Sequence, residues 1–490
     1  MRSPGTLPRV KRAWAVFRRY FGRGLLCVLT GCHNAAVPYL AAPSRCEPHR
    51  NLVAVGQVVE DTAVVTVNRP LETMWSVVSE TADHLRALTQ GGLGKRIVLP
   101  LQGPPGPLPP TPEPLDPSAL ETDLRALTGR ELSPANVQLY VEGQEALTAL
   151  EDLIARATKQ IDIIMFQWEN DPLGRALVER LVARASPTLH VRVLIDGGGN
   201  LCFNEPDGLP ASEVNRVLLP LLHNPYIELV RIRNAFARYD HRKLVLVDGR
   251  LAWSGGRNFS REAFFEHHDL SYVLEGPLVP RLQGRFERYW RTQNGLAPEP
   301  VPEPQPLAPC DEIPQPNTRA RLLLSEPNNR QISRAIYRAI DLAQRHIYVE
   351  NVYLTDSLLV YKLAQARRRG VDVRVVLTVQ STTEIINRAN RVVANRLLAA
   401  GVRVYLYPGM THVKALTVDG VWAYVGTGNL DALSFRHNRE LGLSVSGCPL
   451  IGQLERCLFL PDLRPEWEMT QPLPVTWCDY YAEMLASLCL

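Results

Sequence analysis

The chain has 490 residues, of which 46% are hydrophobic, and this is enough for two or three domains with buried cores. The formal net charge of +4 falls to −3 when the first 31 residues are set aside, because these contain seven basic side chains and no acidic one. A body with that charge lacks the distinctly basic surface of most nucleic-acid-binding proteins, so we expect no nucleic-acid partner. A local basic groove is compatible with this charge, and a nuclease therefore stays among the alternatives.

The first 31 residues predict an export signal. A basic region precedes a short apolar run, residues 24–31, which is shorter than the about 20 residues needed to span a bilayer but suits a signal-peptide core. The sequence Leu-Thr-Gly-Cys that ends at Cys32 is similar to the bacterial lipoprotein box. It predicts lipidation of Cys32 and a membrane-anchored lipoprotein of the bacterial cell envelope. A basic amphipathic segment that stays attached, or a misassigned start codon, is the alternative.

Residues 32–102 predict a small N-terminal region to which the sequence assigns no function. Within it, residues 51–67 are rich in valine and alternate between apolar and polar side chains, which predicts two strands. The proline-rich residues 103–131 predict a semi-rigid linker between this region and the core. The nine cysteines show no Cys-x-x-Cys spacing and predict neither a metal site nor a disulfide framework, although one or two bridges among the last four stay open.

Residues 132–297 and 319–490 predict two similar α/β halves, joined by a second proline-rich linker at 298–318. Apolar strands alternate with amphipathic helices in each half, which favours a largely parallel or mixed sheet covered by helices. Three glycines at 197–199 follow a predicted strand, and we expect a tight turn there rather than a phosphate-binding loop. The chain thus predicts an internal repeat.

Each half contains the pattern His-x-Lys, four residues and Asp, although the chain has only six lysines. One copy is expected by chance in about one of a hundred chains of this composition. A small-residue turn that ends in Asn follows each copy, and an acidic residue lies 28 positions after each His. The two sets are His241, Lys243, Asp248, Asn258 and Asp269 in the first half, and His412, Lys414, Asp419, Asn429 and Glu440 in the second.

These residue types suit chemistry at a phosphate. In a strand, His and Lys two positions apart point the same way, so the Lys neutralises the anion while the His attacks phosphorus or moves a proton. The Asn amides supply donors to phosphate oxygens. A carboxylate that binds one ring nitrogen would fix the tautomer and leave the other nitrogen free, and this is the role expected of Asp269 and Glu440.

The duplicated set resembles the signature of the phospholipase D superfamily, and residues 255–259, 268–277 and 428–441 are similar to its cardiolipin synthase branch. The resemblance covers about residues 132–465. It implies a phospholipase D-like α/β fold whose two halves, related by a pseudo-twofold axis, share one active site. It also implies metal-free phosphodiester transfer through a phosphohistidine, so we expect no cofactor.

The same resemblance implies a role for each signature residue. His241 is expected to be the nucleophile, and His412 the general acid and then the general base. Asp248 and Asp419 belong to the catalytic signature but are expected to bond backbone or neighbouring side chains. The phosphate is expected to be bound by four side chains: Lys243, Lys414, Asn258 and Asn429.

We therefore expect a cardiolipin synthase-like transphosphatidylase that transfers a phosphatidyl group between phosphatidylglycerol molecules and releases glycerol. Its partners would be phospholipids and a membrane surface. A hydrolytic phospholipase D would use the same residues with water as acceptor. A phosphodiesterase or nuclease, and a lipid-binding scaffold that has lost catalysis, are the remaining alternatives.

Overall fold

The computed structural model describes residues 114–202, 215–233, 238–296, 316–327, 329–378, 381, 384–447 and 449–489, together with 59, 61–63, 65 and 66. The predicted export signal, Cys32, most of the predicted N-terminal region and most of both proline-rich linkers lie outside the described residues. Cys457 and Cys478 carry free thiols. Among the described helices, none combines the length and the apolar character needed to cross a bilayer.

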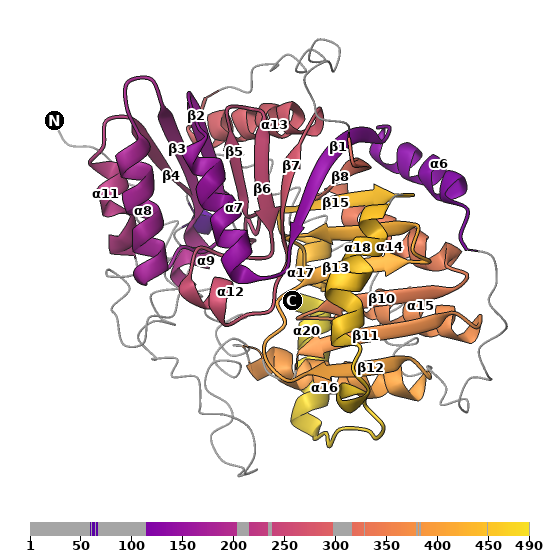
Figure 1. The fold of residues 1–490 in the computed structure, drawn as a ribbon. Coiled ribbons are helices and arrows are strands. Elements are labelled where there is room, and N and C mark those ends of the chain that lie inside the picture. Colours follow the sequence, from indigo (N-terminus) through magenta and orange to yellow (C-terminus); the bar gives the residue numbers. More distant parts are fainter. Residues whose placement is uncertain are drawn as a thin grey trace. The chain divides into compact units, whose positions relative to one another are not determined.

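The described residues contain fifteen strands, which form one mixed sheet (Figure 1). The strands of the first half are β1 (Ser133–Tyr140), β2 (Gln160–Met165), β3 (His190–Asp196), β4 (Ile227–Ile232), β5 (Leu244–Val247), β6 (Leu251–Gly255) and β7 (Ser271–Glu275). Those of the second half are β8 (Thr318–Glu326), β9 (Asn329–Arg330), β10 (His346–Asn351), β11 (Asp372–Thr378), β12 (Arg403–Tyr407), β13 (Lys414–Val418), β14 (Trp422–Gly426) and β15 (Glu440–Ser446).

The strand order is β12-β11-β10-β13-β14-β15-β8-β1-β7-β6-β5-β2-β3-β4, with β9 paired to β8 at the side. Each half contributes seven strands to this path. Equivalent strands of the two halves follow in the same order when the path is traced inward from either end. The halves meet where β1 and β8 pair antiparallel, with Pro134 opposite Arg319. This arrangement confirms the predicted α/β fold of two pseudo-twofold-related halves.

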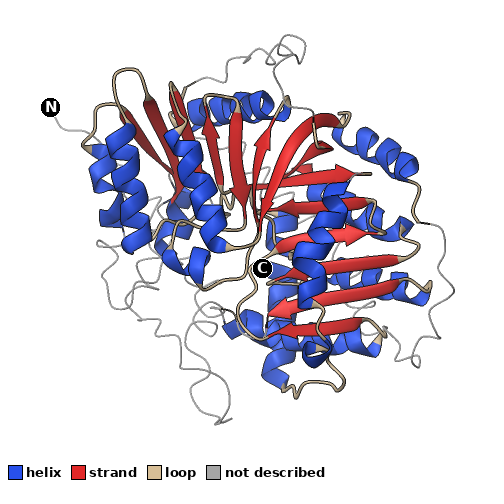
Figure 2. Cartoon of the chain, in the orientation of Figure 1, coloured by secondary structure: helices blue, strands red, loops and turns tan. Residues whose placement is uncertain are grey.

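Helices flank the strands in both halves (Figure 2). In the first half and before it they are α6 (Pro117–Thr128), α7 (Gly143–Ala155), α8 (Pro172–Arg184), α9 (Gly197–Cys202), α11 (Leu219–Leu222), α12 (Arg261–Phe265) and α13 (Leu278–Gln293). In the second half they are α14 (Gln331–Leu342), α15 (Ser357–Arg368), α16 (Glu384–Ala399), α17 (Ala432–Arg436), α18 (Pro449–Leu454), the π-helix η4 (Glu455–Phe459), α19 (Leu460–Asp462) and α20 (Trp477–Cys489).

Equivalent helices begin with equivalent caps. Asp171 and Asp356 start α8 and α15, where their carboxylates accept from the backbone N–H three residues later. Ser260 and Asp431 do the same for α12 and α17. These side chains satisfy backbone donors that the first turn of a helix leaves unpaired. The repeat in the sequence is therefore also a repeat of local folding signals.

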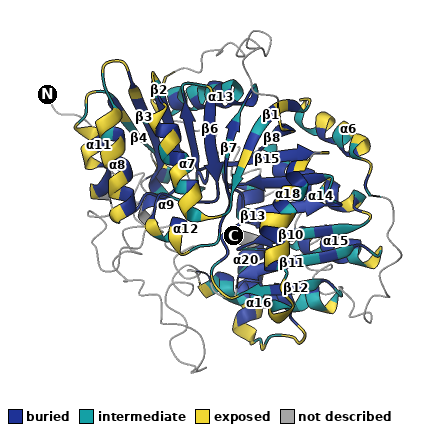
Figure 3. Ribbon diagram, viewed as in Figure 1, coloured by how far each residue is buried: buried dark blue, intermediate teal, exposed yellow. Residues whose placement is uncertain are grey.

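Three large hydrophobic clusters and a small one around Ile386 stabilise the described parts of the two halves. One packs α7 and α8 on β2 and β3, and a second packs α14, α15 and α16 on β10 and β11. The third contains residues of both halves, including Phe286 and Trp290 from α13 and Val413, Leu443 and Phe459 from the second half. Figure 3 shows the strands as largely buried and the outer helix faces as exposed. Because the third core is shared, we expect the two halves to keep a fixed relative position.

The structure corrects three local predictions. Part of the predicted linker 103–131 forms α6, whose Leu120 and Leu124 are fully buried in the core of the second half. The sequence carried the signal for this helix, since Asp116 is its N-cap and a proline occupies its first position. The predicted turn at 197–199 is the start of α9, where the backbone N–H of Gly199 donates to Asp196 over 2.6 Å.

The third correction concerns residues 51–67, for which two strands were expected. The described residues there (59, 61–63, 65 and 66) are helical. Asp61 is buried and pairs with Arg231 of β4 at 2.8 Å. Local alternation cannot reveal this contact, which forms between residues 170 positions apart in the chain.

Candidate active site

The two signature histidines lie where the halves meet. His241 and His412 precede β5 and β13, in short irregular segments rather than inside the strands as expected. Each segment bonds to the other half: the N–H of His241 donates to the carbonyl of Arg439 over 3.0 Å, and the N–H of His412 donates to that of His268 over 2.6 Å. The backbone of one half thereby fixes the position of the histidine of the other.

The acidic partners of the histidines are exchanged between the halves. Nδ1 of His412 lies 2.7 Å from Oδ2 of Asp269, and Nδ1 of His241 lies 3.0 and 3.1 Å from the two oxygens of Glu440. Both carboxylates are fully buried. When ionised, each carboxylate accepts a hydrogen bond from Nδ1–H of its histidine. This fixes the tautomer and leaves the lone pair of Nε2 free. In the sequence, each acidic residue lies 28 positions after the histidine of its own half. In the structure, each acidic residue instead pairs with the histidine of the other half.

The carboxylates are stabilised as anions. Burial raises the pKa of Asp269, but His412 and Lys414 lower it more strongly, and the net pKa is about 2. Burial likewise raises the pKa of Glu440, yet the charge of His241 and its hydrogen bond hold the net value below its ordinary range. Thr427 supports Glu440 further, because its hydroxyl donates to Oε2 over 2.5 Å.

Both signature lysines are buried beside the histidines. Nζ of Lys243 donates to the backbone carbonyl of His241 over 2.8 Å, and Nζ of Lys414 donates to that of His412. Burial lowers the pKa of Lys243 to about 7 and that of Lys414 to about 8. The charge of Lys414 also lowers the pKa of Lys243, so the two ammonium groups of different halves are close enough to repel each other. An anion between them would relieve this repulsion.

The imidazoles share this environment. Burial lowers the pKa of His412 to about 3, and Lys414 contributes in the same direction. Burial also lowers the pKa of His241, with Glu440 opposing the shift and Lys243 supporting it. The free site therefore favours neutral imidazoles, whose Nε2 atoms can act as nucleophile or base. A bound phosphodiester anion would raise both pKa values by compensating the charges of the lysines.

The signature asparagines are held close to the site by other side chains. Nδ2 of Asn258 donates to Gln167 over 3.0 Å, and the side chain of Asn429 bonds the carboxylate of Asp431. An amide NH2 has two hydrogens, so each asparagine keeps one N–H for a ligand. Oδ1 of both residues is buried and accepts no hydrogen bond from the described residues. Ligand atoms could complete the bonding of these side chains.

Asp248 and Asp419 do not join the other signature residues. They follow β5 and β13, at the opposite strand ends from the histidines, and both have positive φ, +52° and +55°. Asp248 accepts four hydrogen bonds of 2.7–2.8 Å from residues 158–160. Asp419 accepts four of 2.8–2.9 Å from backbone N–H groups of residues 115 and 344–346. Both carboxylates bind the backbone turns that precede β2 and β10, so we propose for them the structural role that the resemblance implied rather than a catalytic one.

Phe166 is a site residue that the sequence analysis missed. Its ring lies edge-on to that of His241, with 4.5 Å between the ring centroids. Its centroid also lies 4.7 Å from Nζ of Lys243. A Cβ atom on Gly199 would lie only 2.1 Å from this ring, so glycine is required there. The glycine run therefore contributes to the site by leaving space for the Phe166 ring. Nothing in the sequence joins these positions, because the contact forms only when β2 and α9 come together.

The two copies of the signature are not chemically equal. Gly256 and Thr427 occupy equivalent positions, but a Cβ atom on Gly256 would lie 2.1 Å from Asp269, whereas Thr427 donates to Glu440. The next position is Arg257 in the first half, and its fully buried guanidinium donates to Ser271 over 3.2 Å. The charge of Arg257 also helps to lower the pKa of Asp269. The His412–Asp269 pair therefore has a more cationic environment than the His241–Glu440 pair.

We predict that Asp248→Asn destabilises the protein by about 1–3 kcal/mol, because Asn tolerates positive φ but loses the anionic acceptor. Burial raises the pKa of Asp248, but its hydrogen bonds from residues 158–160 hold the net pKa below the ordinary value. The stabilisation is therefore present above about pH 4 and is lost as the pH falls through the folded-state pKa. Denaturant unfolding at pH 7 and at low pH measures this difference.

Asp123→Ala is the matched control, since it removes an exposed ion pair with Arg338 and should cost less than about 1 kcal/mol. Equal stability of Asp248→Asn and wild type at pH 7 would contradict the structural role of Asp248.

Comparison with known proteins identifies the family. Residues 150–290 and 336–458, one segment in each half, match the family described as cardiolipin synthase, phospholipase D-like domain. A cardiolipin synthase of Listeria welshimeri is 27% identical over 352 residues, which cover 69% of this chain and 70% of that protein. Cardiolipin synthase A of Klebsiella pneumoniae is 26% identical over 323 residues, covering 63% and 65% of the two chains.

The fold is also similar to a solved structure. The crystal structure of phosphatidylserine synthase from Haemophilus influenzae superposes with a TM-score of 0.56 and 16% sequence identity, over 76% of this chain and 100% of that one. At this identity the likeness concerns the fold alone. Since the family match covers more than half of the chain and has one segment in each half, the chain belongs to the phospholipase D superfamily, in its cardiolipin synthase branch, and is a phosphatidyltransferase enzyme.

Proposed function

We propose that this enzyme is a transphosphatidylase that converts two molecules of phosphatidylglycerol into cardiolipin and glycerol. The observation that carries the proposal is the pair of histidines from different halves, each bound at Nδ1 by a carboxylate of the other half. Such a site would offer one Nε2 atom from each half, as a double displacement at phosphorus requires. The similarity to cardiolipin synthases supports the choice of lipid.

In the first step, Nε2 of His241 attacks the phosphorus of phosphatidylglycerol. The bond from phosphorus to the glycerol headgroup breaks, and His412, protonated at Nε2, gives its proton to the departing oxygen. The product is a phosphatidyl group bound covalently to His241. The negative charge of the bound phosphodiester supports the protonation of His412, because it opposes the effect of the buried Lys414 on the pKa of that ring.

In the second step, His412 removes the proton from a hydroxyl of another phosphatidylglycerol. The oxygen attacks phosphorus, the bond to His241 breaks, and cardiolipin is released with both histidines restored. Lys243 and Lys414 bind the phosphate oxygens in both steps, together with the free N–H groups of Asn258 and Asn429. Negative charge that builds up on these oxygens in the transition state is stabilised by groups already in position.

The carboxylates act as positioning residues in this scheme. Glu440 and Asp269 hold the Nδ1 proton of each ring and so present Nε2 to the phosphorus. They also stabilise each ring when it becomes positively charged. Because each carboxylate belongs to the other half, a half alone would have neither an oriented histidine nor an opposing acid.

We further propose that the enzyme meets its lipid at a membrane surface, through a lipid on Cys32 and through one face of α20. Trp477, Tyr480, Tyr481 and Met484 lie at helical spacing and are 90%, 46%, 55% and 39% exposed. Trp and Tyr prefer the interface between water and lipid. α20 packs against α16 and α17, and α17 begins three residues after Asn429.

The two acidic side chains of α20 lie on its opposite face and are paired with arginines, so they do not oppose contact with a membrane. Asp479 pairs with Arg391 at 2.6 Å, and Glu483 pairs with Arg396 at 2.7 Å. Both acidic side chains are buried against α16. The surface that α20 presents outward is therefore aromatic and uncharged over these four residues.

Product analysis tests the lipid chemistry. Purified protein incubated with phosphatidylglycerol vesicles should yield cardiolipin and glycerol in equal amounts, detected by mass spectrometry. Added glycerol should drive the reaction back, since glycerol is the acceptor in the reverse direction. Phosphatidic acid as the main product would instead identify a hydrolytic phospholipase D, and the absence of any product would overturn both.

The two histidines should be equally necessary. His241→Ala and His412→Ala are each expected to lower kcat at least about 10³-fold, because loss of either member of a nucleophile–acid pair disables both steps. His346→Ala is the matched control, since that residue pairs with Glu455 outside the site and should leave kcat unchanged. Mass spectrometry of quenched wild-type enzyme should find the phosphatidyl adduct on His241. An adduct on His412 would reverse the two roles.

Vesicle binding tests the α20 surface. In a Cys32→Ser background, we expect the double substitution Trp477→Ala and Tyr481→Ala to weaken flotation with phosphatidylglycerol vesicles by about tenfold, equivalent to about 1.4 kcal/mol. Leu222→Ala removes a similarly exposed apolar side chain from the first half and serves as the control. Unchanged vesicle binding in the double variant would exclude this face as the membrane contact.

A further inference from the structure

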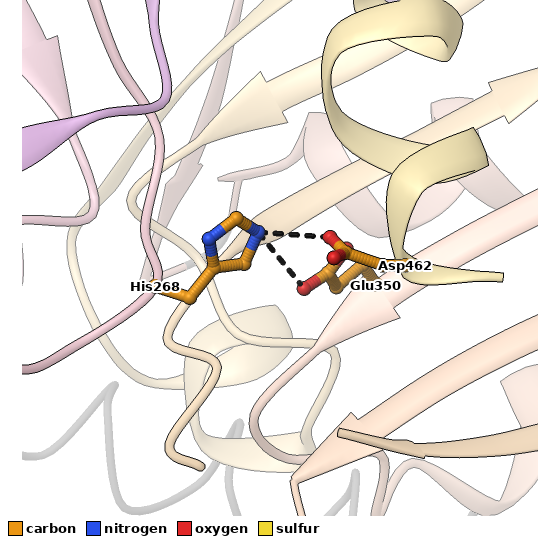
Figure 4. Close-up of side chains that lie close together, drawn as sticks. All are labelled: His268, Glu350 and Asp462. Atoms are coloured by element: carbon orange, nitrogen blue, oxygen red, sulfur yellow. Dashed lines mark hydrogen bonds and ion pairs between the residues drawn. The ribbon is translucent and has the colours of Figure 1, made fainter. Parts of the chain in front are cut away.

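A second cluster of polar side chains is shown in Figure 4. It consists of His268, which precedes β7, Glu350 on β10 and Asp462 at the end of α19. Nε2 of His268 lies 2.9 Å from Oδ2 of Asp462 and 3.7 Å from Oε1 of Glu350. One nitrogen or oxygen atom from each residue lies within 4.8 Å of the other two. Three elements distant in the sequence thus direct one donor atom each toward a common point.

Glu350 and Asp462 face each other in this cluster, and burial and the neighbouring Asp462 raise the pKa of Glu350 to about 8. The residue is completely buried, and its Oε2 accepts no hydrogen bond from the described residues. Its other oxygen accepts from the hydroxyl of Thr411 over 2.5 Å. A second carboxylate, that of Asp462, is only 5% exposed and lies in the same cluster. Burying two facing carboxylates is costly unless a shared proton, the charge of His268 or a bound metal ion compensates them.

We propose that His268, Glu350 and Asp462 bind a divalent transition-metal ion of the zinc or manganese type. One imidazole and two carboxylates are donors that such ions accept. Around an ion with bonds of about 2.1 Å, ligand atoms lie about 3.0–3.4 Å apart. The observed separations of 2.9 and 3.7 Å are on either side of this range, so small side-chain adjustments suffice. The His268 side chain is 16% exposed and provides a route for the ion and for a water ligand.

The ion would act on structure rather than on the phosphorus atom. His268 directly precedes Asp269, and its backbone bonds Met410 and His412 on both sides of Thr411. Glu350 and Asp462 belong to the second half and to its C-terminal helices. An ion held by all three would therefore link the segment that carries Asp269 to the half that carries His412. It would stabilise the interface without contact with the substrate.

Metal binding to the full chain tests this proposal. After chelator treatment and dialysis, wild-type protein should bind Zn²⁺ by calorimetry and Mn²⁺ by electron paramagnetic resonance. Glu350→Gln and Asp462→Asn should each weaken the affinity at least tenfold, because each removes one charged ligand of nearly the same shape. His346→Gln alters a histidine with a single carboxylate partner and should bind as wild type does. Zn²⁺ should also raise the Tm of wild type more than that of the two variants.

Two results would overturn the site: no binding of either ion by wild type, or unchanged affinity in both carboxylate variants. If Glu350→Gln does not fold, as judged by circular dichroism, Asp462→Asn decides alone, because Asp462 lies at a helix end rather than inside the sheet. None of these measurements depends on catalytic activity, so they are independent of the proposed lipid chemistry.

Discussion

Two imidazole–carboxylate pairs cross the interface between the halves, and the rest of the molecule is built to keep them in position. A histidine with a distance of 2.7 Å between Nδ1 and a carboxylate tolerates little relative movement of the segments that carry the two groups. Since both pairs cross in opposite directions, a shift that shortens one would disturb the other. The halves must therefore behave as one rigid unit at this place.

The fold meets this requirement in three ways. β1 and β8 join the two halves into one sheet, and a hydrophobic core contains side chains of both. Backbone hydrogen bonds from each histidine segment to the other half add directional contacts within a few ångströms of the rings. α6 belongs to the same framework, because the N–H of Leu115 bonds Asp419 at the far end of β13. A candidate ion site at His268 would add a fourth link.

Burial shifts the pKa values on which the chemistry of the site depends, and burying these charged groups also costs free energy. Two buried lysines and two buried histidines have lowered pKa values, and the two buried carboxylates remain anions because the lysines and the Nδ1 hydrogen bonds of the histidines are close. A phosphodiester anion is the kind of ligand that would relieve the repulsion between the two buried ammonium groups. The chemical difference between the copies, with Arg257 near one pair and Thr427 near the other, supports distinct roles for the two histidines.

The sequence by itself determined the repeat, the α/β class and ten signature positions, because spacing, apolar periodicity and duplicated polar residues are local properties of the chain. It also contained the cap of α6, although the proline-rich context concealed it. Only the tertiary structure decided that Asp269 serves His412 and Glu440 serves His241, and that Phe166 packs under His241. It also showed which backbone groups bind Asp248 and Asp419. These facts depend on which segments meet across the sheet and the interface, and contacts between residues up to 304 positions apart leave no trace in local spacing.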